Sequence, residues 1–526
     1  MSSREKNIKK NKISNLLAKI TDIYIFIIII LFPLIVDKTG FFKILECKYR
    51  WFICISSIYI ITTTTIYLFS ILRKDKLIER KKLSKIQYLA IIFLICNIIS
   101  YLLSPYLKNY NLLIGVGRGE GLMTSTLYIL TFLYVSYFGN FKKKYILYFS
   151  ISSILVNLIA ILQFIGFNPL NMYQEGIGTH NVSFMTTIGN IDFISALYTM
   201  LLSISFSAFI LIDDNKKHEN IIHLLSLLMG SFILGIIDVS SGKLSFGVTL
   251  VILLPFIFQN NTRLSKFLKC VAIILLGIVT NIILNVEYHY DLGKLGFYFQ
   301  FNYIVLLFII IITALFILSK YILNFNFDLK DNTKHIKNYY KTLIILCLLG
   351  VVAIYLIPFR NGFLYEIHEL LHLNFDDNFG TYRIFLWKRT IPLIKDYPLF
   401  GSGPDTFALR FMPLYSDDIA SIGPLTINDT AANIYLTMLI NLGIIGTISY
   451  LSFIISQIVI GIKKINKYSS ILLISIFCYT VQAFFNLSVV IVSPIFWILM
   501  GLHYLSIEVE KEKNYGSKKD KGKKVE

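Results

Sequence analysis

The chain has 526 residues, of which 56% are hydrophobic, and a formal net charge of +19. A soluble domain of this composition would expose too much apolar surface, so the composition indicates a polytopic helical membrane protein. The six cysteines are scattered and form no CxxC pair, which argues against a disulfide framework and a cysteine zinc site.

Apolar stretches recur along the whole chain, and fourteen of them have about the 17 to 25 residues of a membrane crossing. We therefore predict an all-α transmembrane helical bundle with about 14 spans, within a range of about 12 to 14. The stretches are residues 21–36, 51–72, 87–104, 121–138, 145–167, 189–212, 221–238, 244–259, 270–286, 299–322, 342–358, 431–460, 470–487 and 491–507.

Positive charge sets the expected topology. If residue 1 is cytoplasmic, the predicted cytoplasmic segments hold 36 of the 50 Lys and Arg residues, as the positive-inside rule requires. We expect a multi-pass cell-membrane protein with both termini cytoplasmic, and the basic balance then requires no nucleic-acid partner. The expected parts are a basic N-terminus (1–20), spans 1 to 11 (21–358), a large extracytoplasmic loop (359–430), spans 12 to 14 (431–507) and a basic tail (508–526).

Two outer loops carry candidate binding residues. Arg118 lies in a GRGEG sequence at the start of a span, where an arginine between glycines could hold a phosphate through two hydrogen bonds. The alternative is an interfacial arginine that extends to water. Asn190 and Asp192 lie at the mouth of span 189–212, where a helix cap is the structural alternative to a binding role.

The large loop contains a predicted surface helix, residues 383–398, with an apolar and a charged side. Two residues interrupt this pattern: Phe385 lies on the charged side, and Pro392 would kink the helix. The apolar side holds Leu386, Trp387, Ile391, Leu393 and Ile394, and the charged side holds Lys388, Arg389, Lys395 and Asp396.

Arg383 is the exception on the apolar side of this helix, beside Trp387. A cation aimed toward the membrane needs a partner. A lipid-borne phosphate would supply one, and an ion pair with Asp376 or Asp377 is the alternative.

The loop also contains an HExxH sequence, from His368 to His372, with Glu369 as the possible general base of a zinc site. No Glu follows in the rest of the loop to serve as a third ligand, although Asp396 could. We therefore predict no metal site.

Five short motifs together resemble the family of O-antigen ligases and polymerases, and the resemblance covers about residues 110 to 450. The most specific part lies in the large loop, where several motifs follow in the order the family has. The motifs are GRGEGL at 117–122, GNIDF at 189–193, GTYRIFLWK at 380–388, PLFGSGPDTFA at 398–408 and DTAANIYL at 429–436.

The resemblance implies a glycosyltransferase or ligase of polysaccharide biosynthesis in the cell envelope. It would move a glycan from an undecaprenyl-pyrophosphate carrier to a hydroxyl of a glycan, protein or lipid acceptor on the outer face. No metal or other cofactor is implied. Arg118 and Arg383 correspond to the family's pyrophosphate-binding arginines, and the other residues expected to contact substrate are Glu120, Asn190, Trp387, Lys243 and Lys388.

Two positions depart from the family. Ala432 replaces the histidine expected to act as base, before Asn433, which would orient a group at the top of its span. Gly242 stands where the family has another arginine, with Lys243 next to it. Asp429 is the candidate for a substitute base. The alternatives that stay open are a lipid-linked sugar flippase or transporter, and a catalytically impaired relative that binds the carrier.

Overall fold

The computed structural model describes residues 3–72, 82–165, 167–172, 186–284, 286–289, 294–297, 303–325, 333–360, 362–420 and 429–522. These residues form a helical bundle with one antiparallel hairpin, β1 (Val286–His289) and β2 (Lys294–Phe297). The helices of the first half are α1 (Ser3–Phe26), α2 (Ile44–Leu72), α3 (Lys85–Leu102), α4 (Leu122–Phe138), α5 (Lys144–Phe164), α6 (Ile191–Leu211), α7 (Lys217–Ile237) and α8 (Ser240–Ile257). The second half contains α9 (Asn261–Leu284), α10 (Tyr303–Tyr321), α11 (Thr333–Leu356), α12 (Gly362–Leu371), α13 (Phe379–Leu393), α14 (Phe407–Ala420), α15 (Ile434–Lys463), α16 (Lys467–Gln482) and α17 (Ser493–Gly522).

The predicted fold class is confirmed. Each of the fourteen apolar stretches coincides with a helix, and eleven helices of the described chain are long and apolar enough to cross a membrane. The remaining three stretches correspond to α4, whose 17 residues are fewer than those of the eleven, to α11, whose apolar part is Ile345–Leu356, and to α17. The first candidate span, Lys12–Leu34, is also longer than the predicted stretch 21–36.

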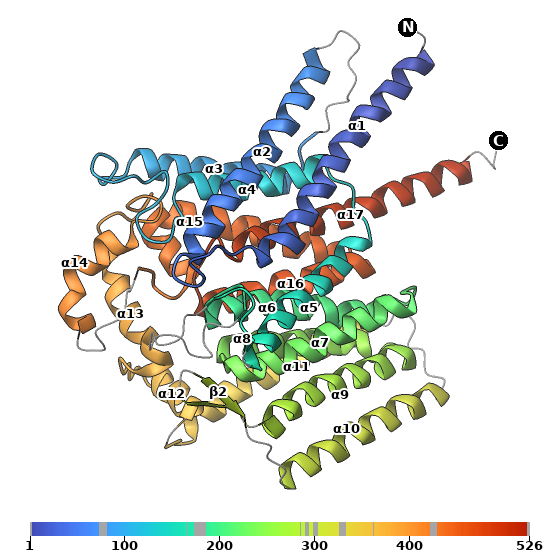
Figure 1. The fold of residues 1–526 in the computed structure, drawn as a ribbon, viewed down its shortest axis with the longest axis vertical. Helices are drawn as coiled ribbons and strands as arrows, with labels where there is room; N and C mark the ends of the chain where they lie inside the picture. Colours follow the sequence, from blue (N-terminus) through green and yellow to red (C-terminus); the bar gives the residue numbers. More distant parts are fainter. Residues whose placement is uncertain are drawn as a thin grey trace.

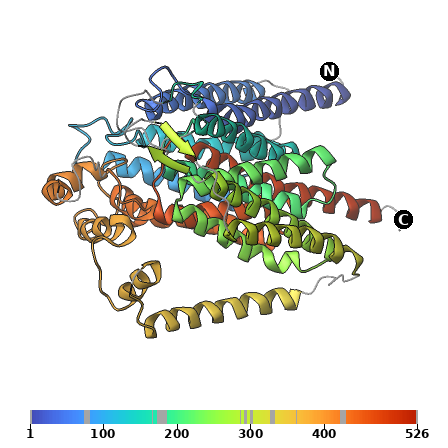
Figure 2. The ribbon, with the colours of Figure 1, turned by 60° about the horizontal axis from the view of Figure 1, so that its bottom comes forward.

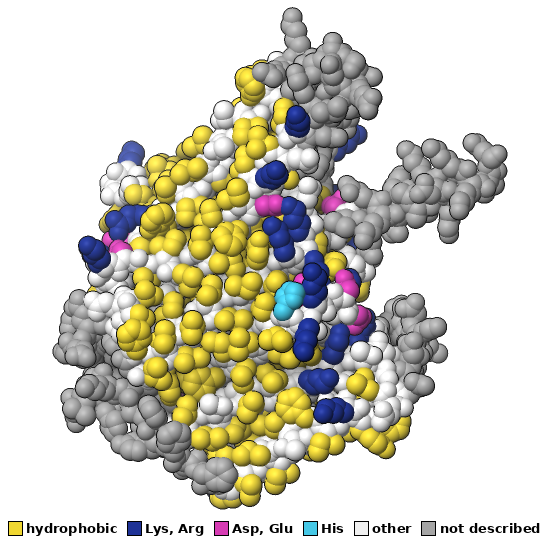
Figure 3. All heavy atoms as spheres, turned by 45° about the vertical axis from the view of Figure 1, so that its right-hand side comes forward, with side chains coloured by type: hydrophobic (Ala, Val, Ile, Leu, Met, Phe, Trp, Pro, Cys, Tyr) yellow, Lys and Arg dark blue, Asp and Glu magenta, His cyan; other side chains and the backbone are white. Residues whose placement is uncertain are grey.

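The bundle has two distinct ends. Both termini lie at one end, and α12, α13 and α14 lie at the other (Figure 1). Between the ends, hydrophobic side chains cover most of the visible surface, while Lys and Arg side chains gather along the edge nearer the termini (Figure 3). A broad apolar band beside a basic edge is the surface expected of a membrane domain.

Helix α6 forms the centre of the bundle. Every residue in the most apolar part of α6 is buried inside the protein, whereas only 17% of the corresponding part of α10 is buried. Helix α11 stands apart from the bundle (Figure 2). Small side chains make this central position possible, because they let neighbouring helices approach closely. Gly242 of α8 faces Ser195 of α6 so closely that a Cβ at residue 242 would lie 2.1 Å from the Ser195 hydroxyl. A side chain at position 242, where the family resemblance leads us to expect an arginine, would therefore require Ser195 to move.

Helix α15 is interrupted at Gly443, where the backbone takes φ +66° and ψ −173°. The interruption leaves backbone groups without helical partners, and buried groups of this kind need replacements. The segment from Pro398 to Gly403 supplies them: Ile444 N donates to Pro398 O at 2.8 Å, and Gly403 N donates to Asn441 O at 2.9 Å. The predicted span 431–460 is thus two helical pieces that hold the PLFGSG motif in place.

The segment 359–430, predicted as one large loop, contains three helices, α12 to α14. A small hydrophobic cluster joins α13, α14 and the start of α15, and includes Phe385, Phe407, Phe411 and Ile440. This cluster is separate from the main core of the bundle. The helices at this end therefore form a compact layer on the membrane domain and carry two of the sequence motifs.

Candidate active site

The GRGEG loop is folded around one buried carboxylate, that of Asp405. Asp405 Oδ2 accepts hydrogen bonds from the backbone N–H groups of Gly117 at 3.0 Å, Arg118 at 3.1 Å and Glu120 at 3.3 Å. Gly115 makes this approach possible, because its φ is +104° and a Cβ there would lie 2.2 Å from the same oxygen. Burial raises the pKa of Asp405 to about 6, although the three N–H donors oppose the shift. Asp405 thus orders the loop that presents Arg118 and Glu120.

Arg118 extends from this loop to the segment before α15. Its Nε lies 2.9 and 2.8 Å from the two carboxylate oxygens of Asp429, and its guanidinium lies 5.7 Å from the centre of the Phe193 ring. The Asp429 carboxylate is therefore engaged with a cation that can only donate. Asp429 also lies outside α15, which begins at Ile434.

Arg383 is held by carbonyl and hydroxyl groups. Its Nη2 donates to Phe485 O at 3.0 Å, and its Nη1 donates to Gly380 O at 2.9 Å and Thr381 Oγ1 at 2.7 Å. Residues 380 to 382 have φ values of 62°, 55° and 64°, a left-handed turn that wraps the arginine. Within the described residues, Arg383 has no carboxylate within 4 Å. The alternative partner considered for Arg383, an ion pair with Asp376 or Asp377, is therefore wrong.

The two arginines share a neighbourhood around the start of α6. The Asp192 carboxylate interacts electrostatically with both Arg383 and Arg118. The segment between α16 and α17 closes this region: Phe485 O accepts from Arg383, and Asn486 Nδ2 donates to Asp192 O at 2.8 Å. Motifs that are far apart in the sequence, GRGEG, GNIDF and TYRIF, thus meet at one end of the bundle.

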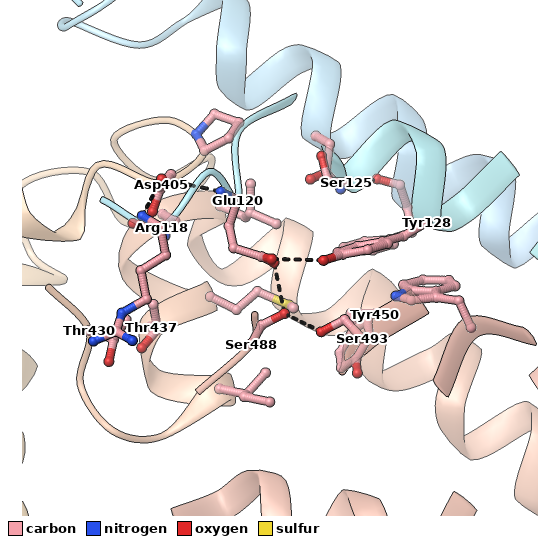
Figure 4. A pocket seen from close by; sticks show the side chains of 18 of the residues that line it. Arg118, Glu120, Ser125, Tyr128, Asp405, Thr430, Thr437, Tyr450, Ser488 and Ser493 are labelled. Carbon is pink, nitrogen blue, oxygen red and sulfur yellow. Dashed lines mark hydrogen bonds between the residues drawn. The ribbon is translucent and has the colours of Figure 1, made fainter. Parts of the chain in front are cut away.

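A cavity of about 110 Å³ lies beside Arg118, between the ends of α3, α4, α15 and α17 (Figure 4). The Glu120 side chain points into it, away from Arg118, toward Tyr128 and Ser488 (Figure 4). Glu120 accepts a hydrogen bond from Tyr128 OH at 2.8 Å and another from Ser488 Oγ at 2.8 Å. Burial raises the pKa of Glu120 to about 7, against the lowering effect of these hydrogen bonds. This carboxyl can therefore change its protonation near neutral pH.

Helix α13 presents Trp387 to the turn before α15. Trp387 Nε1 donates to Ala431 O at 3.0 Å, and its ring lies edge-on to Phe484 at 5.5 Å. Ala432 has a φ of +47° and packs against the cluster formed by α13 and α14. Asn433 caps α15, because its Oδ1 accepts from Leu436 N at 3.0 Å. The Ala432 methyl group thus belongs to the side of the turn that faces α13.

The predicted pattern of α13 is only partly correct. Phe385, assigned to the charged side, is 3% exposed and packs in the small cluster, where the Arg389 guanidinium lies over its ring at 3.7 Å. Ile391, assigned to the apolar side, is 56% exposed. The reason is that α14 covers the helix from a direction that the periodicity of a single helix does not reveal.

Three other predicted residues have structural partners of their own. Asn190 caps α6, since its Oδ1 accepts from Asp192 N at 2.8 Å. Lys243 forms an exposed ion pair with Asp238, and Lys388 forms one with Asp377 at 2.8 Å. Neither lysine contacts Arg118 or Arg383 among the described residues. Exposed pairs of this kind contribute about 0–1 kcal/mol to stability.

The HExxH sequence lies across the end of α12. His368 Nδ1 is 3.1 Å from Glu369 Oε1, and the His372 ring stacks on Tyr355 at 4.2 Å. Over the described part of the chain, no group of three or more His, Cys, Asp and Glu side chains is arranged to hold a metal ion.

The sequence analysis missed several residues of this site: Asp405, Tyr128, Ser488 and Ser493. Asp405 had a signal, since it follows Gly-Pro in one of the motifs. Ser488 and Ser493 had none, because they lie in NLSVVIVS, which has the composition of a membrane span. Only the packing of the α16–α17 connection brings them next to Glu120.

In a comparison with protein families, residues 224–451 match the O-antigen ligase family. The matched region runs from α7 through the break in α15 and includes Arg383, Asp405 and Asp429. Arg118 and Glu120 precede it in the sequence. No curated protein matches the chain.

Proposed function

We propose that this protein transfers a glycan from a polyprenyl-pyrophosphate carrier to an acceptor hydroxyl, and the match of residues 224–451 to the O-antigen ligase family supports this proposal. A membrane protein with an O-antigen ligase or polymerase type of function acts on lipid-linked glycan. The proposal adds the undecaprenyl carrier, the outer membrane face and the residues that bind the pyrophosphate.

The observation that carries this proposal is the state of Arg383. Its guanidinium is fixed by Phe485 O, Gly380 O and Thr381 Oγ1, and no carboxylate of the described residues neutralises it within 4 Å. A cation that is oriented in advance and has no carboxylate within hydrogen-bond distance among the described residues is suited to a phosphate, because charge-assisted hydrogen bonds are the strong ones. Arg118 supports the proposal because it interacts electrostatically with the same carboxylate, that of Asp192, as Arg383 does.

The pyrophosphate would thus bind between Arg383 and Arg118, with Asp192 limiting the positive potential when the site is empty. The sugar–phosphate bond of such a donor is already activated. The protein's task is therefore to hold the leaving group, to position the acceptor and to receive its proton.

Turnover of a lipid-linked glycan by the purified protein in lipid nanodiscs tests the proposal. We expect release of undecaprenyl pyrophosphate that depends on an added acceptor glycan. Surface glycans of cells with and without the protein distinguish its two forms: loss of a chain-length ladder indicates a polymerase, and unattached lipid-linked polymer indicates a ligase. Carrier binding without turnover would instead identify a non-catalytic relative, an alternative that is favoured by Ala432 in place of the expected histidine.

A further inference from the structure

The cavity beside Arg118 offers a general base in a chain whose expected histidine is Ala432. Glu120 is the carboxyl that faces this cavity, and its two oxygens receive hydrogen bonds from Tyr128 and Ser488 (Figure 4). We propose that Glu120 accepts the proton of the acceptor hydroxyl during glycan transfer. This inference rests on the proposed function and names the base at the same site.

Hydrogen-bond chemistry selects Glu120 over the two carboxyls that the GRGEG loop contacts, those of Asp405 and Asp429. Asp405 accepts from three backbone N–H groups, and Asp429 accepts from the Arg118 guanidinium. Backbone and guanidinium N–H groups can only donate hydrogen bonds. They could not accept one from a protonated Asp405 or Asp429, so protonation of either carboxylate would break hydrogen bonds. Hydroxyl groups can both donate and accept, and the partners of Glu120 are hydroxyls.

A chain of hydroxyl groups lets Glu120 take up a proton without losing its hydrogen bonds. Ser488 Oγ lies 2.8 Å from Glu120 Oε2 and 3.0 Å from Ser493 Oγ. When Glu120 becomes protonated, Ser488 can accept from it and donate to Ser493. This rearrangement costs little because only hydroxyl rotors move.

The cavity has room for the hydroxyl group of an acceptor and the atoms next to it. A single water needs about 10–15 Å³ of such volume, and the cavity measures about 110 Å³. Its lining combines Arg118 and Glu120 with aromatic side chains of the bundle, which include Tyr128, Tyr450 and Trp497. An apolar cavity with a few convergent polar groups is the usual form of a ligand site.

The chemical step balances without a cofactor. The acceptor O–H gives its proton to a Glu120 carboxylate oxygen while the hydroxyl oxygen forms a bond to the anomeric carbon of the donor sugar. The bond between that carbon and the phosphate oxygen breaks, and the pyrophosphate leaves with the electron pair, held by the arginines. The proton then passes from Glu120 to solvent.

The charged and titratable groups that face Glu120 come from three directions. Tyr128 lies on α4 and Tyr479 on α16, while Arg118 and Asp405 belong to the loop contacts. Burial and the nearby Asp405 raise the pKa of Glu120, while Tyr128, Ser488 and Arg118 lower it, with a result of about 7. The transfer rate should therefore fall below about pH 7, where Glu120 is protonated.

The test is a pH profile of single-turnover transfer by the full chain in nanodiscs, with a defined lipid-linked glycan as donor. We expect the wild-type rate to rise about tenfold per pH unit to a plateau above pH 7. Glu120→Gln should lower the plateau about 10²–10⁴-fold, flatten the profile and bind undecaprenyl pyrophosphate within about threefold of wild type. Glu46→Gln is the matched control on the same side of the bundle, because Glu46 is exposed, and its profile should match wild type.

A second variant keeps the proposal falsifiable if Glu120→Gln folds poorly. Tyr128→Phe removes a hydrogen bond that favours the carboxylate, so the acid limb of the pH profile, where the rate rises with pH, should move to higher pH. An acid limb at the wild-type pH, or a wild-type rate from Glu120→Gln, would overturn the base role and leave the proposed transfer reaction intact. A wild-type chain that binds the carrier without any turnover would overturn both.

Discussion

The two ends of the bundle differ in the partners of their charged side chains. At the end that holds the termini, the lysines of the short connections pair with acids. Lys143 meets Glu219 at 2.8 Å, Lys266 meets Asp213 at 3.0 Å and Lys467 meets Asp214 at 2.5 Å. The other end also has ion pairs, such as Lys388 with Asp377, but two of its charged residues have neutral hydrogen-bond partners: Arg383 is held by carbonyls and a hydroxyl, and Glu120 by hydroxyls.

This difference indicates two roles for charged side chains: some form ion pairs that hold loops in place, and others can bind a ligand or a proton. An ion pair between exposed side chains has satisfied partners and contributes about 0–1 kcal/mol. A partly buried charge with only neutral partners is less stable by itself and gains more from a ligand of opposite charge or from a proton. Four experiments test this contrast.

The first experiment asks whether the two ends face opposite sides of the membrane, as the distribution of Lys and Arg predicts. Ser416, exposed on α14, and Ser517, on α17, are replaced by cysteine in a chain without its six native cysteines. We expect all-or-none labelling by an impermeant thiol reagent in intact cells, with Ser416→Cys reacting and Ser517→Cys not. Labelling of Ser517→Cys alone would reverse the orientation.

The second experiment tests whether transfer depends on the guanidinium group of Arg383. Arg383→Lys keeps the charge but loses the fork that contacts several acceptors at once. We expect a loss of about 10- to 100-fold in transfer rate, the equivalent of one or two charge-assisted hydrogen bonds. Arg389→Lys is the matched control, because Arg389 lies on the same helix and pairs with Asp377 and Asp418. Equal effects of the two substitutions would show that Arg383 is no more than structural.

The third experiment tests whether Asp429 holds Arg118 in place or acts as the general base. Because Asp429 holds the Nε of Arg118, Asp429→Asn should loosen that arginine and reduce transfer by about tenfold, roughly one charged hydrogen bond. The acid limb of the pH profile should stay near pH 7, since Glu120 is unchanged. Loss of that limb in Asp429→Asn would instead make Asp429 the base.

The smallest expected effect is at Ala432. Histidine tolerates the left-handed backbone found there, so Ala432→His should fold normally. The side chain would face the cluster of α13 and α14. With Glu120 as base, we expect the transfer rate to change by less than about threefold, far below the roughly 10²–10⁴-fold that a general base contributes. A large increase would restore the base role that the family resemblance assigns to this position.

The sequence by itself determined the membrane class, the helices and the two arginines. Long apolar stretches can only be helices in a bilayer, because every backbone group must be satisfied within the segment. The motifs around Arg118 and Arg383 were also visible, since charged residues are rare among apolar spans and stand out individually.

The tertiary structure decided how those residues are used. Asp405 orders the Arg118 loop from 288 positions away along the sequence, and Ser488 meets Glu120 across 368. Such contacts depend on which helices pack together, and hydropathy does not specify this because all spans are similarly apolar. The same reason explains why Glu120 was expected to contact substrate and Asp429 to be the base. Only the packed structure shows that Asp429 is bound to a guanidinium and Glu120 to hydroxyls.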